Sequence, residues 1–287
     1  LVVTLLLGTT VSSTAQTGPP ERESIRPSDL RSDVAFLASD DMRGRLAGSR
    51  ENRLAAAFIR ARFERLGLSP AADDSYLMPF DLIVPAMDAD DAHALDICVR
   101  GEAPAEMTLG RDFFPERISG STRARGRLVY VGFGISAPEL GHDDYAGVDV
   151  TGRVVVLLRH EPGEFDASSP FGGRVASEHA RTSRKALEAQ RRGAVAVLVV
   201  ADVHNHESGT TLGTLMDTTW PAQPQRVPAY ELGAWVDAIR IPVVRISPDV
   251  AARALTETQA GLESLARRAD TDGFRAVAIE TQIEVAA

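Results

Sequence analysis

The sequence has only one cysteine and no excess of basic residues. The single cysteine, Cys98, excludes an internal disulfide bond. Its place in the alternating residues 94–99 (ALDICV) predicts a buried strand position rather than a catalytic thiol. Forty acidic against thirty-one basic residues give a formal charge of −9, which repels a phosphate backbone and offers no counterion release. We therefore expect no nucleic-acid partner.

The sequence also lacks an apolar run long enough to cross a bilayer. The opening residues 1–7 (LVVTLLL) are too short to cross a bilayer, so no membrane span is expected. Together with the small, uncharged residues that lead to Ala15, they are typical of the apolar core and cleavage region of a secretory signal peptide. No basic leader precedes them, which indicates a signal peptide shortened at its front. We expect a signal peptide at residues 1–15 and a secreted or periplasmic protein.

What the sequence does contain is the composition of an ordinary globular protein. Hydrophobic residues make up 44% and charged residues 25% of the chain, without the biases that mark disordered or fibrous proteins. A packed core is expected. The length of 287 residues fits one large domain with an insertion as well as two ordinary domains.

Two helices are predicted near the start of the chain. Apolar residues spaced by four and three positions from Leu30 predict a short helix with Ser28 as its N-cap. Ser49 is the expected cap of a second, longer helix, which Gly67 ends. The apolar residues of the second helix form one stripe: Ala55, Phe58, Ile59, Phe63 and Leu66. Because this stripe needs a partner, we expect poor solubility of the chain expressed alone.

The rest of the chain is predicted to mix strands and helices, so the expected fold class is α+β (mixed α/β). Strands are predicted at residues 81–84, 94–99, 128–133, 154–158, 194–200, 241–246 and 277–285. The run 194–200 is apolar throughout, which predicts a strand buried on both faces. Helices are predicted at residues 176–192 and, after a cap at Ser247, as far as Leu255.

Two short motifs stand out in the N-terminal part. Residues 36–49 read FLASDDMRGRLAGS, and residues 65–70 read RLGLSP. Their order and spacing resemble the start of secreted di-zinc aminopeptidases, a family that also includes glutamate carboxypeptidase-like enzymes. In that family the second motif closes a long helix, as expected here.

The middle of the chain carries a second set of motifs. They are residues 129–136 (VYVGFGIS), 143–149 (DDYAGVD) and 152–156 (GRVVV). This block resembles the protease-associated (PA) domain that is inserted in the same family. Residues 193–197 (GAVAV) and 241–247 (IPVVRIS) are similar to later strands of that domain.

The resemblance implies a fold and a domain organisation. A PA domain of β-strands with flanking helices is inserted into the N-terminal helices and the edge of an α/β zinc-peptidase domain. The implied parts are a signal peptide (residues 1–15), an N-terminal peptidase segment (16–85), the PA domain (86–265) and a return strand toward the catalytic domain (266–287).

The resemblance also implies where the chemistry lies. The zinc ligands of the family open with a His-x-Asp element that is expected beyond Ala287. No catalytic, cofactor-binding or metal-binding residue is therefore assigned to this chain. For the full-length protein the resemblance implies two zinc ions and hydrolysis of the N-terminal bonds of peptide substrates.

Histidines are the candidates for a metal site within the chain: His93, His142, His160, His179, His204 and His206. Residues 142–144 (HDD) have the His-x-Asp spacing, but their acidic residues belong to a turn, where they are expected to cap backbone donors. Residues 204–207 (HNHE) bring two histidines close to Glu207. In an extended segment the histidines share one face and Glu207 points away, which favours a loop rim over a metal site.

Two patterns near residue 134 are weak matches to other activities. Residues 132–137 (GFGISA) follow a predicted strand as a dinucleotide-binding loop does, but Pro138 comes next and no helix N-terminus is available for a pyrophosphate. Ser136 lacks the second glycine and the following helix of a hydrolase nucleophile elbow. Neither nucleotide binding nor serine hydrolase chemistry is predicted.

Two functional hypotheses remain open. In the first, the chain is the N-terminal part of a secreted zinc-dependent aminopeptidase-like peptidase, with the PA domain and without catalytic residues. In the second, it is a stand-alone, non-catalytic interaction module whose PA domain binds peptides or another protein. The first hypothesis depends on ligands outside the chain, because two-metal hydrolysis needs cations about 3.5–4 Å apart and several ligands around them.

Overall fold

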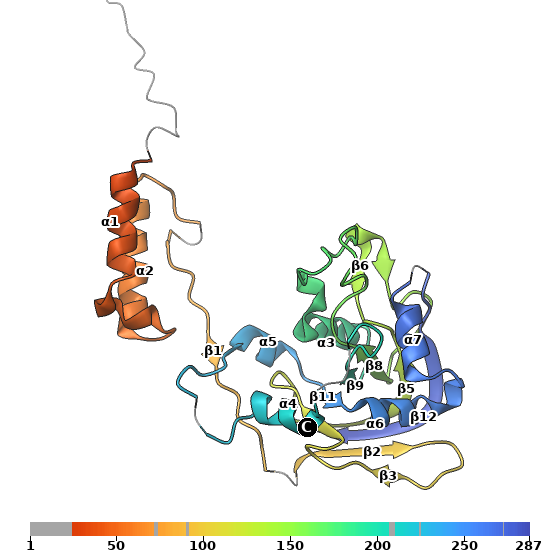
Figure 1. Ribbon diagram of the computed structural model, residues 1–287. Coiled ribbons are helices and arrows are strands. Elements are labelled where there is room, and N and C mark those ends of the chain that lie inside the picture. The colour runs from red at the N-terminus through yellow and green to blue at the C-terminus, as the bar shows by residue number, and fades with distance from the viewer. Residues whose placement is uncertain (1–24, 72–73, 90–91, 207–209, 224, 272) are drawn as a thin grey trace, which may run out of the picture. The chain divides into compact units, whose positions relative to one another are not determined.

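The structure is a computed structural model that describes residues 25–71, 74–89, 92–206, 210–223, 225–271 and 273–287 (Figure 1). The signal segment predicted at residues 1–15 lies outside these residues. The chain divides into two compact units, Leu1–Pro79 and Phe80–Ala287. No helix in the described residues combines the length and the apolar character needed to cross a bilayer.

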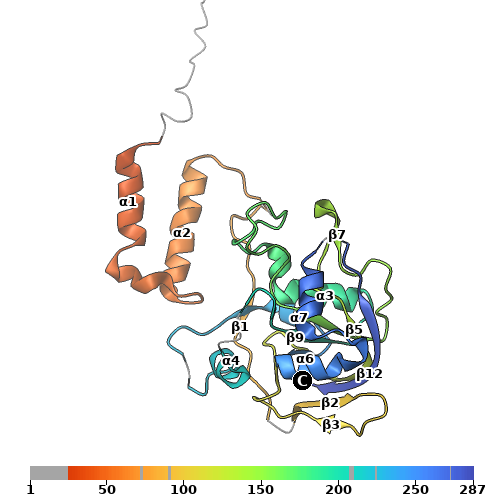
Figure 2. The same cartoon turned by 45° about the vertical axis from the view of Figure 1, so that its right-hand side comes forward.

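In the described residues of the first unit, two helices are joined by a turn. They are α1 (Pro27–Leu37), a 3₁₀ segment (Asp40–Arg45) and α2 (Arg50–Arg65) (Figure 2). The rings of Phe36 and Phe58 lie 4.7 Å apart, and Asp33 Oδ2 lies 2.5 Å from Arg62 Nη2. Because the earlier residue of α1 meets the later residue of α2, the two helices run antiparallel.

The ends of these helices test the predicted caps. Ser49 Oγ accepts a hydrogen bond from the backbone N–H of Asn52 at 3.1 Å, and Gly67 has a φ of 70°, so both predicted ends of α2 are confirmed. The cap predicted at Ser28 is wrong, because α1 begins at Pro27 and has no side-chain cap. Proline suits the first helical position, where a backbone N–H has no partner within the helix.

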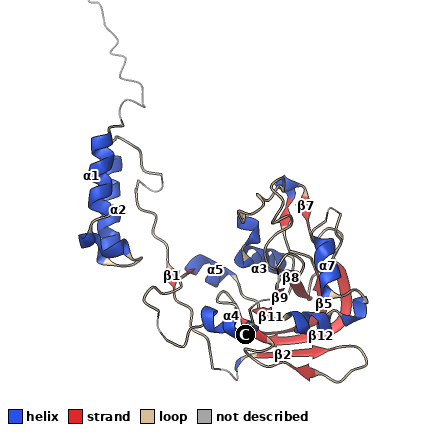
Figure 3. Cartoon of the chain, viewed as in Figure 1, coloured by secondary structure: helices blue, strands red, loops and turns tan. Residues whose placement is uncertain are grey.

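The second unit is built on a mixed eight-stranded sheet in the order β3-β2-β12-β5-β8-β9-β11-β4 (Figure 3). Its strands are β2 (Ala94–Cys98), β3 (Ala105–Glu106), β4 (Phe113–Pro115), β5 (Arg123–Tyr130), β8 (Val154–Leu158), β9 (Ala196–Val200), β11 (Val243–Ile246) and β12 (Val277–Ala286). The strands β5, β8, β9 and β11 pair in parallel, and the other pairings are antiparallel. Two small ribbons pair β1 (Leu82–Ile83) with β10 (Glu231–Leu232), and β6 (Ser136–Ala137) with β7 (His142–Asp143).

Helices pack on both faces of the sheet. On one face, α6 (Pro248–Ala254) and α7 (Leu262–Ala269) share a buried cluster with alternate residues of the central strands. On the other face, Ala186 and Ala189 of α3 (Thr182–Arg191) join a second cluster. All residues of β8 and β9 are buried, which confirms the strand predicted to be covered on both sides. The remaining helices are α4 (Leu212–Thr219) and α5 (Gly233–Ala238).

Most predicted elements are present with shifted ends, and the α+β class is confirmed. Ser247 Oγ accepts a hydrogen bond from Val250 N–H at 3.2 Å and caps α6 as expected. The helix predicted over 176–192 is shorter. Its N-terminal part is a 3₁₀ turn, Glu178–Ala180, and the extended backbone at Arg181 separates this turn from α3.

The last strand lies inside the sheet rather than at its edge. β12 pairs with β2 on one side and with β5 on the other, so residues 277–286 share a sheet with residues 94–98 and 123–130. Likewise, β1 pairs with β10 and belongs to the second unit. The boundary between the two compact units falls after Pro79. The domain limits expected after residues 85 and 265 stay predictions.

We expect the apolar stripe of α2 to lower solubility. Ile59, Phe63 and Leu66 are 42%, 41% and 66% exposed, respectively. Replacing Ile59 and Leu66 together by glutamine should raise the soluble, monodisperse fraction on size-exclusion chromatography, because it removes an exposed apolar patch. Arg60→Gln on the same helix is the control and should have no such effect. A wild-type chain that is already fully monodisperse would contradict the expectation.

Candidate functional site

The candidate site lies where the chain leaves β8 and β9. These strands are parallel neighbours, and Leu158 at the end of β8 pairs with Val200 at the end of β9. The N–H of Arg159 donates a hydrogen bond of 2.9 Å to the carbonyl of Val200, so the two outgoing loops start side by side. Loops at the carboxyl ends of parallel strands are common places for ligand sites.

Aspartates hold both loops in shape. Asp202 is buried and accepts from the N–H of His204 at 3.1 Å and from the side-chain amide of Asn205 at 2.8 Å. The N–H of His206 donates to the Asp202 carbonyl at 3.1 Å, which curls the loop after β9 back on itself. Asp270, just after α7, joins the two loops, since it accepts from Gly163 N–H at 2.7 Å and from the Asn205 amide at 3.3 Å.

Three side chains from these loops converge on one point. His160 Nδ1 lies 2.7 Å from Glu164 Oε2 and 2.6 Å from His206 Nε2. The remaining side of the triangle, from His206 Nε2 to Glu164 Oε2, is 2.7 Å. The three side chains are 29%, 22% and 34% exposed in the order His160, Glu164, His206, so solvent reaches the cluster. A cluster of two imidazoles and a carboxylate is a set that could hold a metal ion.

The charges of the cluster influence one another. Burial lowers the pKa of His160, and the hydrogen bond to Glu164 opposes this effect only in part. Burial raises the pKa of Glu164, but the hydrogen bonds from both histidines outweigh burial and leave this pKa below its ordinary value. Glu164 is therefore an ionised acceptor at neutral pH.

A buried lysine fixes the end of β8 beneath the cluster. Lys185 of α3 is 2% exposed, and its ammonium donates to the carbonyl of Leu158 at 2.9 Å and also to the carbonyl of His160. His160 has a φ of 65°, in the left-handed region that a residue with a side chain rarely adopts. The lysine therefore supports an unusual backbone turn that points the His160 ring toward the second loop.

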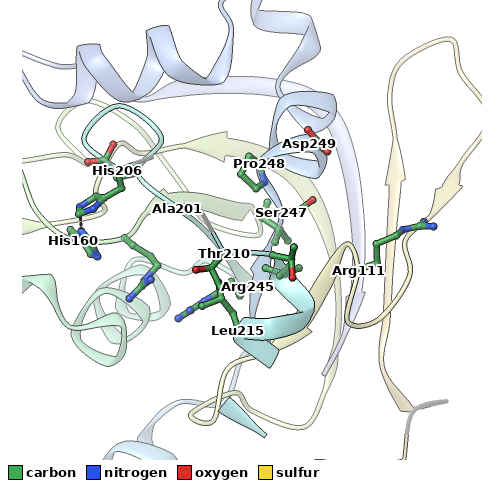
Figure 4. A pocket seen from close by; sticks show the side chains of 15 residues that line it. Arg111, His160, Ala201, His206, Thr210, Leu215, Arg245, Ser247, Pro248 and Asp249 are labelled. Carbon is green, nitrogen blue, oxygen red and sulfur yellow. Dashed lines mark hydrogen bonds between the residues drawn. The ribbon is translucent and has the colours of Figure 1, made fainter. Parts of the chain in front are cut away.

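A cavity of about 370 Å³ opens beside the two histidines (Figure 4). His160 and His206 stand together on one side of it, and Arg245 and Ser247 lie further along its lining. Arg245 is paired with Glu116 at 2.5 Å. The guanidinium of Arg159, which also lines the cavity, makes no hydrogen bond or ion pair with any described residue. The lining also contains Asp202 and Asp249, and Arg111 is paired with Asp112. Among the described residues of the lining, Arg159 is therefore the arginine that is available to an anionic ligand.

The structure separates the histidine candidates named from the sequence. His206 joins the cluster, whereas His204, two residues earlier, does not. The extended conformation expected for this segment is wrong, because the turn closed on Asp202 reverses the chain. Glu207 lies outside the described residues. The pairing of His206 with His160 and Glu164 was missed, although all three residues follow predicted strands, at 154–158 and 194–200.

The acidic turn at residues 142–144 has a structural role. Asp144 is buried and accepts from Ile135 N–H at 3.0 Å, and Asp143 accepts from Tyr145 N–H at 3.1 Å. The prediction that these carboxylates cap backbone donors is confirmed. His142 Nε2 lies 3.0 Å from Asp144 Oδ1.

The residues of the two weak motif matches lie in a tight turn and the short strand after it. Gly132 and Gly134 have φ values of 59° and 68° in a tight turn, and no α-helix follows them. A Cβ on Gly134 would lie 2.8 Å from Leu157 Cδ2. Ser136 Oγ accepts a hydrogen bond from Arg192 at 3.1 Å. Cys98 lies in β2, as predicted, but is half-buried rather than fully buried.

Comparisons with known proteins give few matches. No protein-family model and no curated protein matches the sequence. Among solved structures, an aminopeptidase from Aneurinibacillus sp. strain AM-1 matches over 90% of this chain and 43% of its own, with 17% identity and a TM-score of 0.35. A zinc aminopeptidase from Bacillus subtilis matches over 89% of this chain and 41% of its own, with 16% identity and a TM-score of 0.31. The chain spans less than half the length of either structure.

Removing the buried carboxylate of the acidic turn should destabilise the second unit. Asp144→Ala leaves the Ile135 N–H without an acceptor, and we expect the free energy of unfolding to fall by about 1–3 kcal/mol. Asp149→Ala, which removes an exposed acceptor for Thr151 N–H, is the control and should cost less than about 1 kcal/mol. Urea denaturation followed by circular dichroism measures both. Equal losses would contradict the structural role given to Asp144.

Lys185 should make stability depend on pH. Burial lowers its pKa from 10.5 to about 7, partly opposed by Asp144, Glu161 and Asp202 and reinforced by Arg159. Because the folded-state pKa is the lower one, the unfolded chain binds more protons between these values, and the free energy of unfolding rises with pH there.

The pH-dependent contribution of Lys185 to the free energy of unfolding is measured by comparison of the wild type with Lys185→Met. The difference in free energy of unfolding, wild type minus variant, should grow by up to about 1.4 kcal/mol per pH unit between about pH 7.5 and pH 9. Urea denaturation in metal-free buffers at several pH values gives the two curves. Parallel curves would show that the lysine is not held at a depressed pKa.

Proposed function

We propose that this chain is the non-catalytic N-terminal part of a secreted zinc-dependent aminopeptidase-like peptidase and that it carries the PA domain of that protein. In this proposal the full-length protein removes residues from the N-termini of peptides outside the cytoplasm. Two zinc ions act in a peptidase centre whose ligands follow the segment described here.

The proposal rests on the places that the PA-like motifs occupy in the second unit and on the contacts their residues make. The three matched stretches contribute to β5, β6, β7 and β8, which are consecutive in the chain. Within them, Asp144 anchors the backbone at Ile135, and Gly134 leaves room for the side chain of Leu157. These motif residues hold a turn against a core strand. Their contacts favour the interpretation that the motifs are typical of a fold rather than of a catalytic centre.

The donor groups of this chain also favour a peptidase centre located elsewhere. Within the described residues, the grouping suited to a metal ion is the cluster of His160, Glu164 and His206. Three ligands can hold one cation. A dinuclear peptide hydrolase needs two cations about 3.5–4 Å apart, ligands to both, and a separate general base.

The alternative is a stand-alone interaction module without catalysis. It is favoured by the core of the second unit, because buried clusters on both faces of the sheet are supplied by residues of that unit itself. Such a unit has the means to fold without a peptidase domain. In this case its ligands are peptides or another protein.

The two functions are separated by activity and by the gene. We expect the purified 287-residue chain to show no turnover of an aminoacyl anilide in the presence of zinc. The protein expressed from the complete gene should show turnover that a chelator abolishes, and its sequence should contain a His-x-Asp element soon after the codon for Val285. Chelator-sensitive turnover by the 287-residue chain, or a stop codon that directly follows it in the gene, would argue against the first function.

A further inference from the structure

Hydrogen bonds alone cannot satisfy the three atoms of the His160–Glu164–His206 cluster when the Glu164 carboxylate is ionised. Each pair of atoms lies within 2.6–2.7 Å, so each contact requires one donor and one acceptor. If the Glu164 carboxylate accepts from both rings, the two ring nitrogens face each other as donors. If one of these nitrogens is unprotonated, its lone pair faces the carboxylate. In every arrangement with an ionised carboxylate, one of the three contacts joins either two donors or two acceptors.

A cation removes this conflict because all three atoms can then present lone pairs to it. We propose that His160 Nδ1, Glu164 Oε2 and His206 Nε2 bind one zinc ion, and that the position they leave open faces the adjoining cavity, where Arg159 helps it to take a carboxylate or similar anion. This metal site goes beyond the proposed peptidase function and does not depend on it.

The donor set selects the type of metal. Two imidazoles and one carboxylate suit zinc and other late divalent transition metals, whereas calcium and magnesium prefer all-oxygen surroundings. Zinc bonds of about 2.0–2.1 Å at tetrahedral angles separate ligand atoms by about 3.3 Å. The cluster therefore opens by about 0.7 Å along each side when the ion enters. The side chains are partly exposed and come from loops, so a movement of this size is accessible.

The loops are already arranged for a metal that joins them. His160 and Glu164 belong to the loop after β8, and His206 belongs to the loop after β9. Asp270 binds both loops by hydrogen bonds to Gly163 and Asn205, and Lys185 holds the carbonyl of His160. Backbone and outer partners that fix a ligand in place are typical of metal sites and raise their affinity.

The charges around the open position favour an anion. Zinc with two neutral imidazoles and one carboxylate has a net charge of +1. The adjoining cavity is lined by Arg159, by the ion-paired Arg245 and by Asp202 and Asp249, so the ion and Arg159 supply the attraction for an anion. The guanidinium of Arg159 has no hydrogen-bonding or ion-pair partner among the described residues, although it lies close enough to Glu164 for their charges to interact. An anionic fourth ligand neutralises the ion and at the same time pairs with a guanidinium, which holds carboxylates in a bidentate manner.

The first test measures zinc binding by the full 287-residue chain after treatment with a chelator and dialysis. Titration against a chromophoric zinc chelator should give one zinc ion per chain, and zinc should raise the melting temperature. His206→Ala and the nearly isosteric Glu164→Gln should each weaken zinc binding by more than about 100-fold, because loss of even an outer partner costs about 10–100-fold. Circular dichroism of the zinc-free proteins checks that both variants are folded.

His204→Ala is the matched control, since His204 lies on the same loop but outside the cluster. It should bind zinc as the wild type does. The proposal is overturned if the wild type binds no zinc at micromolar concentration, if His206→Ala binds as tightly as the wild type, or if His204→Ala loses as much affinity as His206→Ala. Stronger binding of calcium or magnesium than of zinc would also overturn it.

The second test measures the anion. Acetate and an N-acetylated amino acid, titrated into the zinc-loaded chain, should bind with at least about 10-fold higher affinity than to Arg159→Ala, because a bidentate charge-assisted contact is lost. Arg111→Ala is the control at the same cavity, where Arg111 is already paired with Asp112. Carboxylate binding that does not depend on zinc, or that Arg159→Ala leaves unchanged, would refute the assignment of the open position.

Discussion

Parallel pairing of β8 with β9 is the constraint on which the candidate site depends. Backbone pairs from Val154 with Ala196 to Leu158 with Val200 hold the strands in register. Since both strands run the same way, both outgoing loops start at one edge of the sheet. The two loops therefore lie close together although they are far apart in sequence. His206 contacts His160 across a separation of 46 residues.

The end of β8 is held from α3 by the buried amino group of Lys185. Burying a charge is costly unless hydrogen bonds replace its water, and Lys185 finds the carbonyls of Leu158 and His160. The ring of Phe133 lies 5.6 Å from the ammonium nitrogen and adds a cation–π contact. Through Lys185, the packing of α3 on the sheet is coupled to the backbone turn that carries the first ligand. A change in the packing of α3 is therefore expected to shift the backbone that positions His160.

The chain uses its acidic residues in two different ways. Asp144, Asp202 and Asp270 accept hydrogen bonds from backbone N–H groups and so fix the loops. Glu164 instead faces two histidines. The protein as a whole has a net charge of −9, and the cavity beside Glu164 has both arginines and aspartates in its lining. Arg111 and Arg245 are ion-paired there, so attraction of an anion depends on Arg159.

The sequence by itself determined the local structure. Apolar runs located β8 and β9, Ser49 and Ser247 marked the starts of α2 and α6, and the acidic turn was correctly read as a set of backbone caps. These features depend on residues a few positions apart, so their physics is visible in a short window. Only the tertiary structure decided that β12 lies between β2 and β5 and that His206 meets His160 and Glu164. The periodicity of a strand shows which of its faces is buried, but its neighbours in the sheet are chosen by packing between distant segments.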